Sequence, residues 1–322
     1  MNFKKILSFL LCPVLIFSLC ACRGSDDDGK KRIAVIAKAV NSDFWNNVKN
    51  GVYSAATEYN VSVTFEGPEN EEDYAAQNLM IDNAVKDGVD AIVLSAIDYN
   101  KSVETVNSAV RAGVKVITID SGINSDMVSL FIGTDNIEAG KAAGKAAADG
   151  FANEAQINIG LVNYNADTDN GNQREQGFRE YISGVPNARI VGSITADSNS
   201  ESATKSAKKL LYENPQINVL VGFNEWMTLG VGNAIKELSL AGKVLGIGFD
   251  TNVISVEMIE TGEMDALIVQ NPFAIGYLGV KNAAELISGE NIGSGELYTD
   301  VTVVTKENLF DPDIQKMLFR FD

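Results

Sequence analysis

Short apolar runs alternate with longer amphipathic stretches along the chain from Lys31 onward. A short apolar run suits a strand buried on both faces of a parallel sheet, whereas apolar residues at every third or fourth position suit a helix lying on that sheet. The alternation therefore predicts repeated βα units and an α/β fold. Strands are expected at residues 33–37, 61–65, 91–94, 116–119, 157–162, 190–194, 219–223, 244–249, 266–270 and 301–304.

The expected helices follow the same scheme in both halves of the chain. They lie near residues 44–58, 74–86, 101–111, 172–182, 201–212, 227–237 and 254–260, and a last one near 312–318. Another helix is expected to start at Asn271, because Pro272 is favoured in the first turn of a helix.

Two of the expected strands end in an aspartate. Asp250 follows residues 244–249, and Asp120 follows residues 116–119. Ligands of open α/β sheets bind beyond the carboxyl ends of the strands, so the sequence predicts two carboxylates that face one crevice from opposite sides. The alternatives are that each aspartate caps a helix or makes a structural hydrogen bond between lobes, which is common directly after a strand.

The glycine patterns do not indicate a nucleotide site. Gly246 and Gly248 lack the third glycine and the directly following helix of a dinucleotide fingerprint, and no P-loop occurs. Gly140 and Gly144 form a GxxxG pattern among charged residues, which favours close packing of a helix over a membrane dimer.

Length and charge narrow the class of protein. A chain of 322 residues is long for one α/β domain and comfortable for two. The net charge is -17, with 26 basic and 43 acidic residues, and it becomes -19 when Lys4 and Lys5 are removed with the first 21 residues. Nucleic-acid binding requires a basic surface, so a nucleic-acid partner is not expected.

Histidine is absent from the sequence, and the three cysteines all lie within the first 22 residues. Without histidine, Ser-His-Asp hydrolysis, Cys-His chemistry and histidine-based zinc sites are excluded. No cofactor, metal site or disulfide is expected.

Residues 1–21 are predicted to be a signal peptide, and residues 22–30 a polar tether. Lys4 and Lys5 precede an apolar stretch at 6–17, and the segment LCAC follows at 19–22. This segment resembles a bacterial lipobox, which implies cleavage before Cys22 and a lipid on its sulfur. The protein is then expected at the outer face of the bacterial cell membrane, or in the periplasm of an envelope with two membranes. An uncleaved anchor helix and a plain signal with a chance cysteine are the alternatives.

Seven short motifs occur in a fixed order: FW at 44–45, GVDAIV at 88–93, VITID at 116–120, GTDN at 133–136, REQGF at 174–178, GIGFD at 246–250 and VQNP at 269–272. Together they resemble the periplasmic sugar-binding proteins of the ribose-binding type, which are the substrate-binding subunits of ABC importers. The resemblance covers residues 31–306.

The resemblance implies the type I periplasmic binding fold, with two doubly wound lobes that close on a ligand by a hinge. The chain is expected to cross between lobes near residues 134–135, 270–271 and 300–301. The first lobe then comprises residues 31–134 with 271–300, and the second comprises 135–270 with 301–322. Family members mostly act as monomers.

The family's ligand positions fall on residues whose chemistry suits a neutral polyhydroxylated ring. Aromatic rings stack on the apolar face of a sugar, while carboxylates and amides bind its hydroxyls. The expected ligand-binding residues are Lys38, Ser42, Phe44, Trp45, Asp120, Ser121, Asn172, Arg174, Asn224, Phe249, Asp250 and Gln270. Phe44 and Trp45 are alternatively core residues, Arg174 alternatively pairs with Glu175, and Trp226 is left outside the set.

Some positions depart from the ribose pattern. Ser121 and Asn172 stand where ribose binders carry arginines, and Lys38 stands where they carry a serine, so ribose is not assumed to be the ligand. Lys38 and Asp120-Ser121 resemble the branch that contains receptors for the quorum signal autoinducer-2 and for some deoxy sugars. That match is partial, because further positions of those receptors fall on Asn170, Gly171 and Phe223.

The sequence thus predicts a solute-binding protein that delivers a sugar or polyol to an ABC permease. A sensory module for a membrane kinase or chemoreceptor is the second hypothesis, since it would use the same fold and pocket. A LacI-type regulator is rejected, because an export signal occupies the place of its DNA-binding helices. An enzyme is not expected, although Asp120 and Asp250 could formally act as the acid and base of a glycosidase.

Overall fold

The computed structural model describes residues 29–151, 156–164 and 167–318. The predicted signal peptide, Cys22 and most of the predicted tether lie outside the described residues. Residues 31–322 form one compact unit, to which the following description applies. Within the described ranges, no helix is both long and apolar enough to cross a membrane.

The first of two six-stranded sheets is parallel throughout. Most of its strands are short runs of buried apolar residues, as the sequence predicts for a sheet covered on both faces. In spatial order the strands are β11 (Glu296–Thr299), β5 (Phe131–Thr134), β4 (Lys115–Ile119), β3 (Ala91–Leu94), β1 (Arg32–Ile36) and β2 (Ser62–Glu66).

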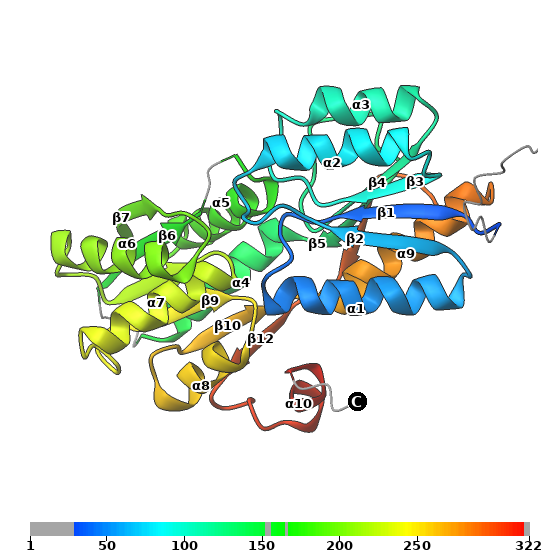
Figure 1. Cartoon of the computed structure of the whole chain (residues 1–322). Helices are drawn as coiled ribbons and strands as arrows, with labels where there is room; N and C mark the ends of the chain where they lie inside the picture. Colours follow the sequence, from blue (N-terminus) through cyan, green and yellow to red (C-terminus); the bar gives the residue numbers. More distant parts are fainter. Residues whose placement is uncertain (1–28, 152–155, 165–166, 319–322) are drawn as a thin grey trace, which may run out of the picture. The chain divides into compact units, whose positions relative to one another are not determined.

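Helices cover both faces of this sheet (Figure 1). Helices α1 (Asp43–Glu58) and α9 (Pro272–Ile287) pack together on one face, and α2 (Tyr74–Lys86) and α3 (Val103–Arg111) lie on the other. Each face has its own buried apolar cluster. A Cβ on Gly51 would lie 2.1 Å from the carbonyl oxygen of Phe273, so glycine allows α1 and α9 to approach closely.

The second sheet is parallel except at one edge, where β12 (Thr302–Thr305) pairs antiparallel with β10 (Ala266–Val269). The order continues with β9 (Leu245–Phe249), β8 (Val219–Gly222), β6 (Ile157–Asn163) and β7 (Ala188–Thr195). Its helices are α4 (Asn136–Asp149), α5 (Asp169–Ser183), α6 (Ser200–Glu213), α7 (Glu225–Glu237), α8 (Val253–Thr261) and α10 (Pro312–Leu318). The prediction of two doubly wound parallel sheets is confirmed.

Helices α4 and α5 pack closely because glycines lie at their contact. A Cβ on Gly140 would lie 2.1 Å from the carbonyl oxygen of Arg174, and one on Gly177 would lie 2.0 Å from that of Ile137. The first glycine of the GxxxG pattern therefore serves helix packing, and this packing holds the backbone of Arg174 against α4.

The chain passes between the sheets three times, because β5 is followed by α4, β10 by α9, and β11 by β12. The sequence patterns did not indicate β5 or β11. Strand β5 is only four residues long and contains Gly133, and β11 is largely exposed, so neither forms a clear apolar run. The exact lobe boundaries stay a prediction.

Candidate functional site

Asp120 and Asp250 occupy matching positions in the two sheets. Asp120 directly follows β4 and Asp250 directly follows β9, and both adopt a left-handed backbone with φ of 58° and 65°. This conformation is uncommon outside glycine, although aspartate tolerates it better than most residues. In each case the backbone N–H is fixed by the neighbouring strand, at 3.0 Å from the carbonyl oxygen of Ile132 or Ile268. This left-handed turn changes the direction of each side chain after its strand, and both carboxylates line the same cleft.

The cleft is lined by side chains that follow strands of both sheets. They are Lys38, Ser42, Phe44, Trp45, Glu71, Asp120, Tyr164, Asn170, Arg174, Asn224, Glu225, Trp226 and Asp250. Together they leave only about 20 Å³ of free space, which is close to the room one water molecule needs. A sugar therefore requires these side chains to separate before it can enter.

Lys38 connects the two sides of the cleft. Its ammonium lies 3.4 Å from Oδ2 of Asp120 and donates to Oδ1 of Asn170 at 3.2 Å. Asn170 in turn donates to Oδ1 of Asp120 at 3.2 Å and accepts from the hydroxyl of Tyr164 at 2.7 Å. Burial opposes the charged form of Lys38, but the surrounding carboxylates, Asp120 first, raise its pKa above the ordinary value. The side chain of Lys38 is therefore a protonated ammonium group that donates hydrogen bonds.

Arg174 is the corresponding cation beside Asp250, at 3.9 Å from Nη1 to Oδ2. It is held by Asn136, which accepts from Nε at 2.8 Å, and its guanidinium lies 4.8 Å above the ring of Phe249. Its Nη2 is buried and has no hydrogen-bond partner among the described residues. Burial raises the pKa of Asp250, although Arg174 and Gln270 oppose the shift. A hydroxyl oxygen of a ligand would satisfy the free donor of Arg174.

Glu71 joins the loop after β2 to the loop before α6. Its Oε1 accepts from the indole N–H of Trp45 at 2.9 Å, and its Oε2 accepts from the hydroxyl of Ser198 at 2.8 Å. The same hydroxyl accepts from Nδ2 of Asn224 at 3.0 Å, and the backbone N–H of Ser198 donates to Glu72 at 2.6 Å. These bonds connect segments from both sheets along one margin of the cleft.

Glu225, the first residue of α7, faces the start of α1. Its Oε2 accepts from the backbone N–H of Phe44 at 3.3 Å, and its Oε1 accepts from Asn252 at 2.9 Å. Burial, reinforced by the negative charge of Asp250, raises the pKa of Glu225 to about 7. This carboxyl is therefore partly protonated near neutral pH.

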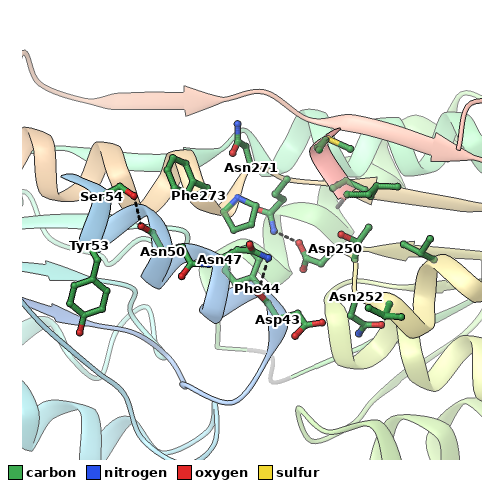
Figure 2. Close-up of a pocket in the computed structure, with 18 residues that line it drawn as sticks. Asp43, Phe44, Asn47, Asn50, Tyr53, Ser54, Asp250, Asn252, Asn271 and Phe273 are labelled. Atoms are coloured by element: carbon green, nitrogen blue, oxygen red, sulfur yellow. Dashed lines mark hydrogen bonds between the residues drawn. The ribbon is translucent and has the colours of Figure 1, made fainter. Parts of the chain in front are cut away.

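A wider groove of about 790 Å³ adjoins the cleft and shares Phe44 and Asp250 with it. Figure 2 shows both residues beside Asn47 of α1 and Asn252, which caps α8. The groove holds few charged groups, whereas the cleft holds most of the buried charge.

The structure brings eight of the twelve predicted ligand residues to the cleft: Lys38, Ser42, Phe44, Trp45, Asp120, Arg174, Asn224 and Asp250. Ser42 and Asn224 also cap α1 and α7, by accepting from Trp45 and Met227. Trp45 also belongs to the apolar core, so the core interpretation and the binding interpretation both apply to it.

The other four predicted residues lie behind or outside the cleft. Phe249 is buried beneath Arg174, and Gln270 donates to Asp250 at 2.6 Å. The hydroxyl of Ser121 is buried and lacks a partner among the described residues. Asn172 is exposed, because it lies two residues after the buried Asn170 in α5 and therefore on another face of the helix. The sequence pattern predicted that this helix starts at Asn172, whereas it starts at Asp169. In the observed helix Asn170 and Arg174 share the inward face one turn apart.

Sequence reasoning missed five lining residues: Glu71, Tyr164, Asn170, Glu225 and Trp226. Tyr164 and Asn170 follow β6, and Glu225 and Trp226 follow β8, so the rule that ligands lie beyond strand ends would have found them. Glu71 lies in a run of acidic residues, whose ordinary interpretation is an exposed loop.

Known proteins share the fold of this chain. A family model described as a periplasmic binding protein domain matches residues 33–291. The chain belongs to the periplasmic binding protein family. Within the family, the D-allose-binding periplasmic protein of Escherichia coli is 27% identical over 255 residues, which cover 77% of this chain and 82% of that protein.

Two solved structures of the family bind sugars. An ABC transporter solute binding protein of Agrobacterium vitis with bound D-fucose is 34% identical, covers 89% of this chain and 100% of its own, and has a TM-score of 0.85. A carbohydrate transporter solute binding protein of Agrobacterium radiobacter in complex with D-arabinose is 29% identical, covers 90% and 99%, and has a TM-score of 0.87.

These likenesses confirm the predicted resemblance to ribose-type periplasmic sugar-binding proteins and the type I periplasmic binding fold. The relatives are sugar-binding components of ABC transporters. A periplasmic binding protein acts outside the cytoplasm, so membership of the family implies export.

Proposed function

We propose that the protein is the substrate-binding subunit of an ABC importer, and that it captures a sugar or sugar-like polyol in the cleft for delivery to a membrane permease. The observation that carries this proposal is the pairing of Asp120 with Lys38 and of Asp250 with Arg174 in one cleft. Each pair offers acceptors and donors fixed in direction, as adjacent sugar hydroxyls require.

The aromatic lining supports a ring-shaped ligand. Phe44 and Trp45 meet edge to face, with ring centroids 5.0 Å apart, and Trp226 lines the same cleft. Aromatic faces contact the C–H face of a sugar ring, while the charged groups bind its edge. The unpartnered Nη2 of Arg174 is a donor that a hydroxyl of the ligand would satisfy.

The small free volume of the cleft supports binding by hinge closure. The two sides are connected by contacts between Lys38 and Asn170, Ser198 and Glu71, and Phe44 and Glu225. We propose that these contacts break when the lobes open and form again around the ligand, so that a permease recognises the closed form. In this proposal the lobes are residues 31–134 with 271–300, and 135–270 with 301–322.

The remaining parts of the proposal concern the site of action. The protein is expected to be a monomer that is anchored through lipid on Cys22 at the outer face of the cell membrane. Labelling of cells with a radioactive fatty acid tests the anchor, because the label should be lost in a Cys22→Ala variant. An unchanged label would contradict it.

Isothermal titration calorimetry with neutral pentoses, hexoses and deoxy sugars, and with the corresponding amino sugars, tests the binding function. We expect one-to-one binding of at least one sugar, and loss of its uptake in cells that lack the protein. Binding without any effect on uptake would favour the alternative of a sensing module. Catalysis is not part of the proposal, and turnover of aryl glycosides that is abolished by Asp250→Asn would overturn it.

A further inference from the structure

The charged side chains of the cleft do not balance. Four acidic side chains line it, those of Glu71, Asp120, Glu225 and Asp250, against two cations, Lys38 and Arg174, so the acids remain in excess even with Glu225 partly protonated. All six residues are at most 7% exposed. Buried charges in proteins are normally paired, because an unpaired buried charge loses its hydration without compensation.

The excess of acidic side chains in the cleft is due to Glu71 and Glu225. Lys38 pairs with Asp120 and Arg174 with Asp250, whereas neither Glu71 nor Glu225 makes an ion pair with any described residue. Glu71 accepts from Trp45 and Ser198, which are neutral donors. Glu225 likewise accepts from the backbone of Phe44 and from the side chain of Asn252. Each carboxylate oxygen has a second lone pair that these bonds do not require.

The aromatic groups in the cleft favour a cation as well. Trp226 is adjacent to Glu225 in α7 and lines the cleft, and Trp45 donates directly to Glu71. Carboxylates beside aromatic faces form the environment in which proteins bind ammonium groups. Burial, with the negative charge of Asp250 added, raises the pKa of Glu225, and an ammonium group beside this carboxyl would favour its charged form.

We propose that the ligand of the cleft is a sugar carrying a protonated amino group, and that Glu225 and Glu71 supply its counter-charge. This inference rests on the proposed sugar-binding function and specifies the chemical class of the sugar. An ammonium group donates hydrogen bonds and carries one positive charge, so it satisfies free acceptor positions on these carboxylates and lowers the imbalance. The ring hydroxyls remain for Asp120, Asp250 and Arg174.

The test is calorimetric titration at pH 7 with matched ligands. D-Glucosamine, D-galactosamine and D-mannosamine are each compared with the neutral parent hexose and with the N-acetyl form, which keeps the nitrogen without its charge. We expect at least one amino sugar to bind tenfold or more tightly than both neutral counterparts. Glu225→Gln, which keeps the shape and an acceptor oxygen, should reduce this preference at least tenfold.

A control variant and a second test variant distinguish the role of the cleft carboxylates from general effects of removing a charge. Glu237→Gln changes an exposed carboxylate at the other end of α7 and should leave the preference intact. Glu71→Gln should weaken binding of the amino sugar in the same direction as Glu225→Gln.

Equal or tighter binding of the neutral hexoses would overturn the inference and leave the proposed function in place. An amino-sugar preference that survives in both Glu225→Gln and Glu71→Gln would also overturn it. Absence of binding by every sugar tested, from a protein with an intact cooperative unfolding transition, would overturn the proposed function as well.

Discussion

Replacing Glu225 by glutamine should change how the stability of the protein depends on pH. Burial raises the pKa of Glu225 from 4.5 to about 7, and the side chain is only 6% exposed, so solvent screens the effect little. A raised pKa means that the folded protein favours the neutral carboxyl. Its stability contribution is complete below pH 4.5 and is lost as the pH rises through 7.

The size of this loss follows from the shift. One pKa unit corresponds to about 1.4 kcal/mol, so ionising Glu225 in the folded protein costs about 3 kcal/mol in total. Most of the loss, about 2.5 kcal/mol, falls between pH 5 and pH 8. Glutamine cannot ionise, and therefore Glu225→Gln should avoid this loss while keeping an acceptor for Phe44 or Asn252.

Urea unfolding at pH 5 and at pH 8 measures the effect on the protein saturated with a neutral sugar, which holds the lobes closed over Glu225. The free energy of unfolding of the parent protein should fall between the two pH values by about 2.5 kcal/mol more than that of Glu225→Gln. Glu237→Gln on the same helix should behave like the parent. If the parent and Glu225→Gln lose the same free energy between pH 5 and pH 8, the carboxyl titrates normally and the account of its burial is refuted.

Three further predictions concern the groups around the cleft. Arg174→Met should destabilise the fold by about 3 to 5 kcal/mol in urea unfolding, because Asp250 is left buried beside no cation; a loss under 1 kcal/mol would contradict this. Asp250→Asn should weaken sugar binding by about 2 kcal/mol, roughly 30-fold, in calorimetry, and unchanged affinity would remove Asp250 from the site. Gly140→Ala should cost about 3 kcal/mol of unfolding free energy, because its Cβ would meet the backbone of α5. The control Gly184→Ala, where the nearest atom is 3.5 Å from the added Cβ, should change the unfolding free energy by less than about 1 kcal/mol. Equal effects of the two variants would contradict the close packing of α4 on α5.

Hydrophobic patterning predicted most of the fold because buried parallel strands are short apolar runs. Strand β3 and helix α2 begin and end at the residues that the pattern indicates. Patterning failed where burial is uneven or where polar residues begin a helix. Strand β11 is largely exposed, and the first turn of α5 contains Asp169, Asn170 and Gly171, which give no apolar signal.

The candidate site was predictable in part for the same reason. Asp120 and Asp250 could be found because each ends an apolar run, and the ends of parallel strands meet at one edge. Asn172 was predicted from the family's ligand positions, but α5 directs Asn170 toward the cleft and leaves Asn172 exposed. Glu71 and Glu225 are buried by segments that are distant in sequence, so only the folded chain reveals them.

The proposal that a sugar is held between the two sheets is tested most directly by a thermal-shift screen of the purified protein, after unfolding and refolding to remove carried-over ligand. The screen includes pentoses, hexoses, deoxy sugars and amino sugars. A ligand at 100 times its dissociation constant should add about 2.7 kcal/mol of stability. We predict a clear rise in melting temperature with at least one sugar. In both Asp120→Asn and Asp250→Asn, which follow strands of different sheets, the stabilisation should fall to about 1 kcal/mol or less. An undiminished rise in either variant, or no rise with any sugar, would contradict binding between the two sheets.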